Sequence, residues 1–295
     1  MREESFKRAD SRIRDFFERN RAKAYTSHDI QDIFEANRNE WRIAGYRNYK
    51  HFITYLKNQK ILVLDNQVHE VSKSKKQILR KKKATPFHVG LTVKKDGYLS
   101  HYSAMQIHGL TLQIPKTVYV SEDHYQSTGE NKQTNLEQAA VDKAFSKPQR
   151  VAHETYRSEY DGFRYFYLQR KHKSIKTGVV QIRDLKVTDL ERTLIDIAVR
   201  PVYSGGSFQV VEAFKNAKEN IDVKRINQYL NELNYIYPYH QLLGFYLDLV
   251  GMSESTLDIF LKQKSHINFY QTYNLTNKRY NQKWGIYYPK GLEGV

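Results

Sequence analysis

The chain has 295 residues, no cysteine and a formal net charge of +16, from 48 Lys and Arg against 32 Asp and Glu. Its hydrophobic content of 40% is enough to build the cores of two domains, which excludes an intrinsically disordered protein. Without cysteine there are no disulfides, thiolate metal sites or cysteine nucleophiles, and the positive charge favours a polyanionic partner.

Most of the basic excess lies in the N-terminal third. Residues 1–88 hold 21 Lys and Arg against 11 Asp and Glu, a net charge of +10, which leaves +6 for the other 207 residues. No apolar segment has the length of a signal-peptide core or a membrane span, so we expect a cytoplasmic protein that contacts no membrane. The first predicted helix, at residues 4–19, places Phe6, Ile13 and Phe17 on one face.

Residues 26–71 predict two helices and a hairpin in succession. The first helix has Ser27 as its N-cap and an apolar face. The second helix is amphipathic: its apolar face consists of Tyr49, Phe52, Ile53 and Leu56, and its polar face of Arg47, Lys50, His51, Thr54 and Lys57. Two short apolar runs, 61–64 and 68–71, then flank the turn residues Asp65 and Asn66. This order predicts a winged helix-turn-helix, with the hairpin as its wing.

A winged helix-turn-helix suits duplex DNA, because the major groove admits one α-helix whose polar face can contact base edges. The segment 73–83 follows the hairpin, and seven of its eleven residues are basic, so we expect a solvated linker that contacts phosphates. No catalytic residue, cofactor or metal ligand is predicted. The predicted DNA-binding residues are Arg42, Arg47, Asn48, Lys50, His51, Thr54, Lys57, Lys73, Lys75, Lys76, Arg80, Lys81, Lys82 and Lys83.

The basic segment ends ahead of Pro86, and we place a domain boundary there. The predicted fold class is α+β: a winged helix-turn-helix domain at residues 1–85, then a larger mixed α/β domain at 86–295 that ends in a helical region. Helices are predicted at 97–109, ended by Gly109, and at 135–146. Strands are predicted at 117–120, 151–155, 163–168 and 179–182, with a loop at 121–131. Later helices are predicted at 208–218, 223–233, 240–250 and 255–261.

Another helix is predicted to begin at Thr188. Thr188 and Glu191, three residues apart, fit a capping box, in which each side chain satisfies a free backbone N–H of the other residue. Leu190, Leu194 and Ile197 then form the buried face.

Several phrases of the sequence are more specific than these patterns. They are LSHYSAMQIHGL at 99–110 with VYV after it, VTDLERTLID at 187–196, RPVYSGG at 200–206 and LLGFYLDLVG at 242–251. In order and spacing they resemble the AbiEi-type antitoxins of type IV toxin–antitoxin (abortive infection) systems, which also act as transcriptional repressors. The resemblance covers residues 5–262.

The resemblance implies an N-terminal winged helix that binds inverted repeats in its own promoter, and a C-terminal domain needed for antitoxin activity. It also implies a nucleotidyltransferase-like toxin, encoded alongside, as the functional partner. Direct contact with that toxin, and dimerisation or cooperative binding on DNA, stay open.

A metal-dependent nuclease and an RNA-binding protein are the alternatives. Asp184-Leu185-Lys186 has the D-x-K ending of a metal-dependent nuclease core, and Asp161 could supply the second carboxylate. The run Tyr165-Phe166-Tyr167 could provide rings for stacking RNA bases. Because such short motifs recur by chance, our leading prediction is a DNA-binding protein that is not an enzyme.

Overall fold

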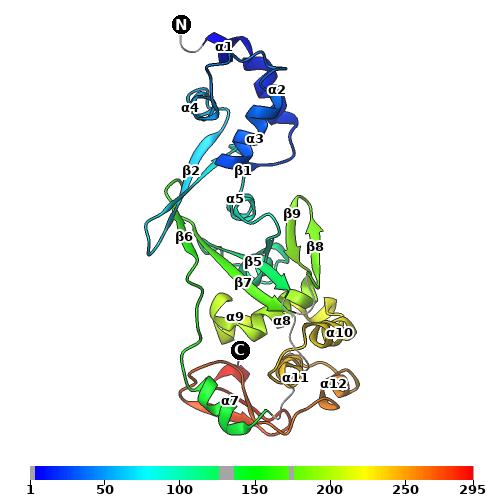
Figure 1. Cartoon of the computed structure of the whole chain (residues 1–295). Coiled ribbons are helices and arrows are strands. Elements are labelled where there is room, and N and C mark those ends of the chain that lie inside the picture. The colour runs from blue at the N-terminus through cyan, green and yellow to red at the C-terminus, as the bar shows by residue number, and fades with distance from the viewer. Residues whose placement is uncertain (1–3, 126–135, 173–175, 295) are drawn as a thin grey trace. The chain divides into compact units, whose positions relative to one another are not determined.

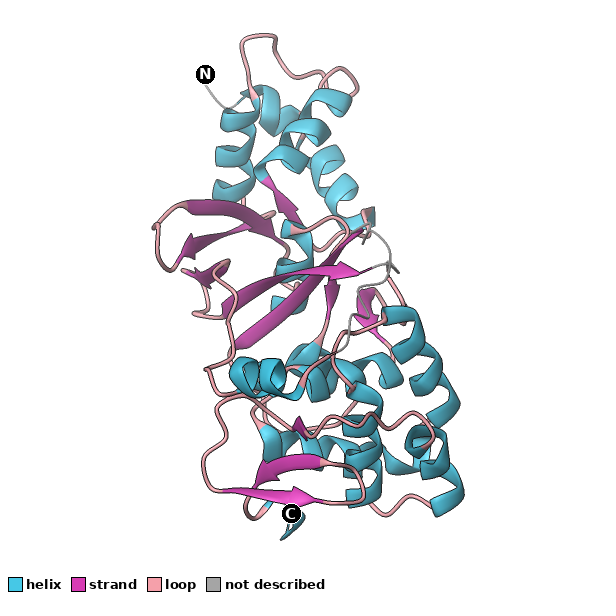
Figure 2. Cartoon of the chain, turned by 60° about the horizontal axis from the view of Figure 1, so that its bottom comes forward, coloured by secondary structure: helices cyan, strands magenta, loops and turns pink. Residues whose placement is uncertain are grey.

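The structure is a computed structural model, and it describes residues 4–125, 136–172 and 176–294. Helices and strands are mixed along the chain, which confirms the predicted α+β class (Figures 1 and 2). The chain folds into two compact units. The first comprises Met1–Lys95, Lys116–Val118 and Glu154–Phe166, and the second comprises Asp96–Pro115, Tyr119–His153 and Tyr167–Val295. Two short segments from the middle of the chain therefore complete the first unit, in addition to the residues before the expected boundary.

The first unit combines helices with several antiparallel strands of a nine-stranded sheet. Strand β3 pairs with β1 and β2, and β2 also pairs with β6. In Figure 1, α2, α3 and α4 lie together beside β1 and β2. The elements are α1 (Glu4–Arg8), α2 (Asp10–Arg19), β1 (Ala24–Thr26), α3 (Ser27–Asn37), α4 (Tyr49–Asn58), β2 (Val63–His69), β3 (Lys75–Arg80), α5 (Pro86–Val93), β6 (Thr155–Ser158) and the start of β7 (Arg164–His172).

The two helices predicted within residues 26–58 are confirmed as α3 and α4. The N-cap of α3 is Thr26 rather than Ser27. The Thr26 hydroxyl accepts a hydrogen bond from the Asp29 N–H at 3.1 Å, and the Asp29 carboxylate accepts one from the Thr26 N–H at 2.8 Å. This capping box places the first residue of the helix at Ser27.

The hairpin lies further along the chain than predicted. Asp65 and Asn66, expected in its turn, lie inside β2 opposite Ile78 and Gln77 of β3. The actual turn is at residues 70–74, and most of the expected linker is strand β3. Asp and Asn usually favour turns, but Asp65 is buried in the strand, where its carboxylate accepts hydrogen bonds from other parts of the first unit.

The second unit contains a second group of paired strands. Strand β4 pairs antiparallel with β5 and parallel with β9, and β8 pairs antiparallel with β9. Helix α6 follows β4 and ends before Gly109, whose φ of +68° is the predicted left-handed conformation. The elements are β4 (Tyr98–Leu99), α6 (His101–Ile107), β5 (Thr117–Tyr125), β8 (Val179–Ile182) and β9 (Leu185–Thr188).

Some predicted strand and loop limits change. Strand β5 runs through Ser121 to Tyr125, which were expected to form a loop, and the rest of that loop lies outside the described residues. The strand predicted at 151–155 lies instead at β6. The strands predicted at 163–168 and 179–182 are confirmed as β7 and β8.

Helix α8 (Leu190–Val199) begins with a different cap from the one predicted. Its N-cap is Asp189, whose carboxylate accepts a hydrogen bond from the Arg192 N–H at 2.9 Å. Thr188 ends strand β9, and its hydroxyl is 2.8 Å from that of Thr193. Glu191 is buried and accepts a hydrogen bond from the Asp222 N–H at 2.9 Å. The Thr188–Glu191 capping box is therefore wrong, because the strand continues through Thr188.

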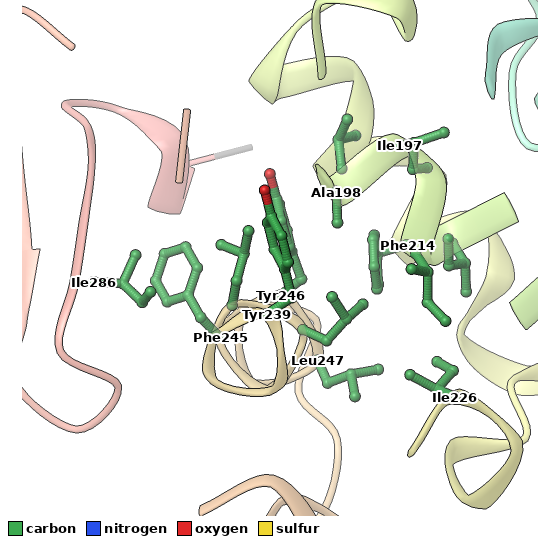
Figure 3. Close-up of a cluster of buried hydrophobic side chains, with 14 of the residues drawn as sticks. Ile197, Ala198, Phe214, Ile226, Tyr239, Phe245, Tyr246, Leu247 and Ile286 are labelled. Atoms are coloured by element: carbon green, nitrogen blue, oxygen red, sulfur yellow. The ribbon is translucent and has the colours of Figure 1, made fainter. Parts of the chain in front are cut away.

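The helices of the second unit pack around one apolar core. Figure 3 shows Ile197 of α8, Phe214 of α9, Ile226 of α10 and Leu247 of α11 within this cluster. The predicted helices are confirmed to within a few residues. They are α7 (Gln138–Phe145), α9 (Ser207–Ala217), α10 (Val223–Leu233), α11 (Tyr239–Leu249) and α12 (Glu254–Leu261), and short 3-10 turns lie at Pro201–Tyr203, Lys218–Asn220 and Leu292–Gly294.

The chain ends in a small sheet rather than in the predicted helical region. Its strands are β10 (Phe269–Tyr270), β11 (Lys278–Asn281) and β12 (Ile286–Pro289), in the spatial order β10-β12-β11. Trp284 attaches the sheet to α11: its ring is fully buried and its Nε1 donates to Asp248 at 2.7 Å. Gly244 permits this packing, since a Cβ there would lie 2.1 Å from the Trp284 ring. Strands this short give too little alternation to be recognised from sequence.

Candidate nucleic-acid interface

Helix α4 has one buried side and one exposed side. Phe52 and Leu56 are fully buried, whereas Lys50, Thr54 and Lys57 are exposed. The amphipathic pattern of the sequence therefore corresponds to the actual orientation of the helix. Its polar side is available for contact with a partner.

Phe52 fixes the orientation of α4. Its ring centroid lies 5.4 Å from that of Phe34, 5.5 Å from Trp41, 5.8 Å from Phe6 and 6.4 Å from Phe17. These partners come from α3, from the loop after it, from α1 and from α2. Aromatic pairs at such separations contribute about 0.5–1.5 kcal/mol each beyond area burial. Rotation of α4 about its axis would break all four contacts.

The exposed side of α4 has no nearby carboxylate in sequence. No Asp or Glu occurs between Glu40 and Asp65, so every charged side chain of α4 and the segments flanking it is cationic. Helix α3 differs, because Asp32 and Glu35 are exposed on it. Since carboxylates repel phosphates, α4 is better suited than α3 to face a polyanion.

The N-terminus of α4 is capped by a reciprocal pair of side chains. Asn48 Oδ1 accepts hydrogen bonds from the N–H groups of Lys50 and His51, both at 3.1 Å. His51 Nδ1 accepts one from the Asn48 N–H at 3.3 Å. Because Nδ1 is an acceptor here, we assign the proton of the neutral ring to Nε2. His51 is exposed, so Nε2–H is a donor that can reach an acceptor outside the chain.

Arg47, predicted to read bases, is buried instead. Its guanidinium lies over the rings of Phe6 and Tyr46, at 5.4 and 5.1 Å from their centroids, and the residue is 8% exposed. The prediction that Arg47 faces outward is wrong, because the loop before α4 directs this side chain onto the aromatic core. Arg42, in the same loop, is exposed and has a φ of +54°.

Arg38 shapes the loop that precedes α4, and sequence reasoning missed it. One of its Nη atoms donates to the carbonyl groups of Ala44, Gly45 and Arg47, at 3.4, 3.1 and 3.3 Å. Its guanidinium also lies 5.4 Å from the ring centroid of Phe34. A polar loop gives no periodic signal for a side chain that bonds to backbone carbonyl groups, so this role was not visible in the sequence.

The basic segment 73–83 is not a continuous phosphate-binding surface. Lys75 pairs with Glu159 at 2.6 Å, and Lys76 pairs with Glu154 at 3.2 Å. Both glutamates come from a distant part of the sequence. The other lysines are Lys73 in the hairpin turn, Lys81, which donates to the Asn20 carbonyl at 2.6 Å, and the exposed Lys82 and Lys83.

Arg80, also predicted to bind DNA, is buried in an ionic cluster of the first unit. Its Nη1 donates to Asp161 at 2.9 Å and to Asp65 at 3.3 Å, and its other Nη donates to the Ala84 carbonyl. Asp65 also accepts from Ser158 Oγ at 2.7 Å. Burial raises the pKa of Asp65, against the opposing effect of these hydrogen bonds. The prediction for Arg80 is wrong, because its charge is already neutralised inside the fold.

The residues considered for a nuclease have other neighbours in the structure. Asp161 belongs to the first unit and pairs with Arg80. Asp184 lies in the turn between β8 and β9, and Lys186 lies in β9, both in the second unit. Within the described residues there is no group of three or more His, Cys, Asp or Glu placed to hold a metal ion.

The tyrosine-rich run in β7 does not offer its rings for stacking. Tyr165 and Tyr167 are 0% and 2% exposed. Phe166 points to the other face of the strand, where the Arg164 guanidinium lies 5.1 Å from its ring centroid. The two tyrosines are therefore part of the buried structure, as strand aromatics often are, whereas Phe166 is half-buried.

The second unit contains a buried ionic cluster that the sequence analysis did not identify. Asp196 Oδ1 accepts from Arg170 at 2.6 Å and from Arg192 at 2.9 Å, and Arg170 lies 3.1 Å from His101 Nε2. Burial alone would raise the pKa of Asp196, but the charges of Arg170 and Arg192 outweigh it and hold that pKa well below its usual range. The i, i+4 spacing of Arg192 and Asp196 was the available signal, but such pairs are usually exposed.

The comparisons with known proteins define a fold and no function. The chain is similar to the crystal structure of the RV2827C protein from Mycobacterium tuberculosis, with a TM-score of 0.57 and 14% sequence identity over 95% of this chain and 91% of that one. At this identity the likeness concerns the fold alone. No protein-family model and no curated protein matches the chain. Among the helices of the described residues, none has the length and apolarity needed to cross a bilayer.

The Asp196 cluster generates a stability prediction. Asp196→Asn should lower the free energy of unfolding at neutral pH by about 3–5 kcal/mol, because two buried guanidinium groups lose their counter-charge. The folded-state pKa is depressed, so this stabilisation is present above the unfolded pKa of about 4 and is lost as the pH falls through the folded pKa. The wild type should therefore lose more stability on acidification below about pH 4 than the variant does.

Urea unfolding followed by circular dichroism measures both effects. Asp258→Asn, which removes the same charge from an exposed position on α12, is the matched control and should change stability by less than about 0.5 kcal/mol. An Asp196→Asn protein as stable as this control would contradict the role assigned to the cluster.

Proposed function

We propose that the protein is a DNA-binding repressor that contacts duplex DNA through its first unit. One observation carries this proposal: α4 exposes Lys50, His51, Thr54 and Lys57 in a segment of the chain without Asp or Glu, while Phe52 fixes the orientation of the helix. The lysines would contact phosphates, which supply affinity. His51 and Thr54 would hydrogen-bond to base edges in the major groove, which supplies specificity.

The order of elements supports a winged helix-turn-helix as the DNA-binding module. In this proposal α4 is the recognition helix, α3 packs against it, and the β2–β3 hairpin is the wing. The turn of that hairpin carries Lys73, whose φ is +59° and whose Nζ donates to the Glu70 carbonyl at 2.7 Å. Lys73 would meet a neighbouring phosphate from there.

The predicted contact residues divide into two groups under this proposal. Arg47 and Arg80 stabilise the module from inside, and Asn48 acts mainly as the cap of α4. Lys75, Lys76 and Lys81 are engaged with other groups of the first unit. The residues proposed to face DNA are Arg42, Lys50, His51, Thr54, Lys57, Lys73, Lys82 and Lys83.

The target and the biological role rest on the resemblance to AbiEi-type antitoxins. On that basis we propose that the protein acts in the cytoplasm, binds inverted repeats upstream of its own gene and counteracts a nucleotidyltransferase-like toxin encoded beside it. The proposal contains no catalytic step. Co-expression with the neighbouring gene tests the antitoxin role, and growth arrest that is as severe with this protein as without it would refute that role.

Binding to the duplex from upstream of the gene should depend on the lysines of α4. Lys50→Gln and Lys57→Gln should each weaken binding and reduce the slope of log K against log salt by about 1, because each removes one phosphate contact. Lys75→Gln is the control, since it removes the same charge but from a pair with Glu159. Fluorescence anisotropy over a range of salt concentrations gives the slopes, and equal effects of the three substitutions would contradict the assignment of α4.

The same assay distinguishes two roles of His51: a contact with a DNA base, and the capping of the N-terminus of α4. His51→Ala should weaken binding to the upstream duplex more than binding to an unrelated duplex, because only a base contact depends on sequence. An equal loss on both duplexes would mean that His51 only supports the helix.

A further inference from the structure

A row of aromatic rings crosses the C-terminal sheet. It begins at Phe145 of α7 and continues through Tyr270 of β10, Tyr287 of β12 and Tyr280 of β11. The successive ring centroids are 5.7, 5.1 and 4.9 Å apart. Tyr287 is the register partner of both Tyr270 and Tyr280, so the three tyrosines lie on the same face of the sheet.

This row leads from the buried core to an exposed edge. On the opposite face of the sheet, Phe269 and Ile286 are fully buried in the core of the second unit. Tyr280 is 45% exposed and belongs to β11, an edge strand of the sheet. Its hydroxyl donates to Asn268 Oδ1 at 2.7 Å, which holds the ring in place. Within the described residues, Tyr287 is the only ring that contacts Tyr280.

The same part of the chain concentrates the positive charge of the second half. Residues 262–295 contain six Lys and Arg and one acidic residue, a net charge of +5, whereas residues 89–261 have a net charge of only +1. The Lys278 ammonium lies on the tyrosine face, 4.5 Å from the ring centroid of Tyr287 and 5.2 Å from that of Tyr270. Lys278 forms no ion pair in the described part of the chain, whereas its neighbour Arg279, on the other face, pairs with Glu293 at 2.5 Å.

We propose that this face binds an unpaired nucleotide, whose base stacks on the outer side of the Tyr280 ring and whose phosphate is neutralised by Lys278. A planar base extends the row of rings by one member, and a phosphate supplies a counter-charge for Lys278, whereas the carboxylate of Asp142 near this face accepts a hydrogen bond from the Tyr270 hydroxyl at 2.9 Å. A nucleotide combines both groups. The faces of duplex bases are covered by their neighbours, so the ligand is single-stranded RNA or DNA, or a free nucleotide. This site is separate from the duplex site proposed for α4, and does not depend on it.

Binding of a short, fluorescently labelled single-stranded nucleic acid to the full-length protein, followed by fluorescence anisotropy, tests the site. The Lys50→Gln and Lys57→Gln substitutions are present throughout, so that α4 contributes less non-specific binding. Tyr280→Leu should weaken binding about tenfold, the loss expected for one base–aromatic stack. Tyr280→Phe keeps the ring and loses only the hydrogen bond to Asn268, so it should bind more tightly than Tyr280→Leu. Lys278→Gln should weaken binding more than Arg279→Gln, which removes the same charge from the opposite face.

Competition identifies the ligand. The unlabelled single strand should compete well, and competition by AMP at similar concentrations would identify a free nucleotide as sufficient. The corresponding duplex should compete much more weakly than the strand. Three results would each overturn the proposal: no binding of either the strand or AMP, full binding by Tyr280→Leu, or equal competition by the duplex. None of them bears on whether α4 binds duplex DNA.

Discussion

The packing of Phe52 against four aromatic rings is the constraint on which the candidate interface depends. It joins α4 to α1, α2, α3 and the loop at Trp41 in one aromatic cluster. Because Phe52 points inward, Lys50, Thr54 and Lys57 must point outward, as the helical periodicity requires. The packing of the buried side of α4 thus determines which side chains it exposes. Arg47 packs on this cluster rather than reaching solvent, because its guanidinium lies over the ring of Phe6 and over that of the exposed Tyr46.

A basic composition does not by itself make a basic surface. Arg80 pairs with two carboxylates inside the first unit. Lys75 pairs with Glu159, and Lys76 pairs with Glu154. These acidic partners are distant in sequence. Fewer basic side chains of the segment 73–83 are therefore available to bind phosphate than the local sequence suggests. The loop and helix between Glu40 and Asp65 contain no Asp or Glu, and within the described residues Lys50 and Lys57 form no ion pair, so α4 retains its positive exposed side.

Local patterns predicted the helices well, because an apolar face at a spacing of three and four residues needs only neighbours in sequence. They failed where a distant group decides the structure. Asp65 lies in a strand instead of a turn because Arg80 and Ser158 bond to its carboxylate. Thr188 ends a strand instead of capping a helix because β9 pairs with β8. The C-terminal sheet depends on the contact of Trp284 with Gly244, which no sequence period encodes.

The most direct test of the proposed contact between α4 and DNA uses the absence of cysteine from the chain. A single Lys50→Cys or Asp32→Cys substitution allows a photo-cross-linker to be attached to the exposed side of α4 or of α3. With the full-length protein bound to the duplex from upstream of its gene, position 50 should cross-link to bases in the major groove, and position 32 should not. Cross-linking from position 32 together with none from position 50 would contradict the assignment of α4 as the helix that enters the groove.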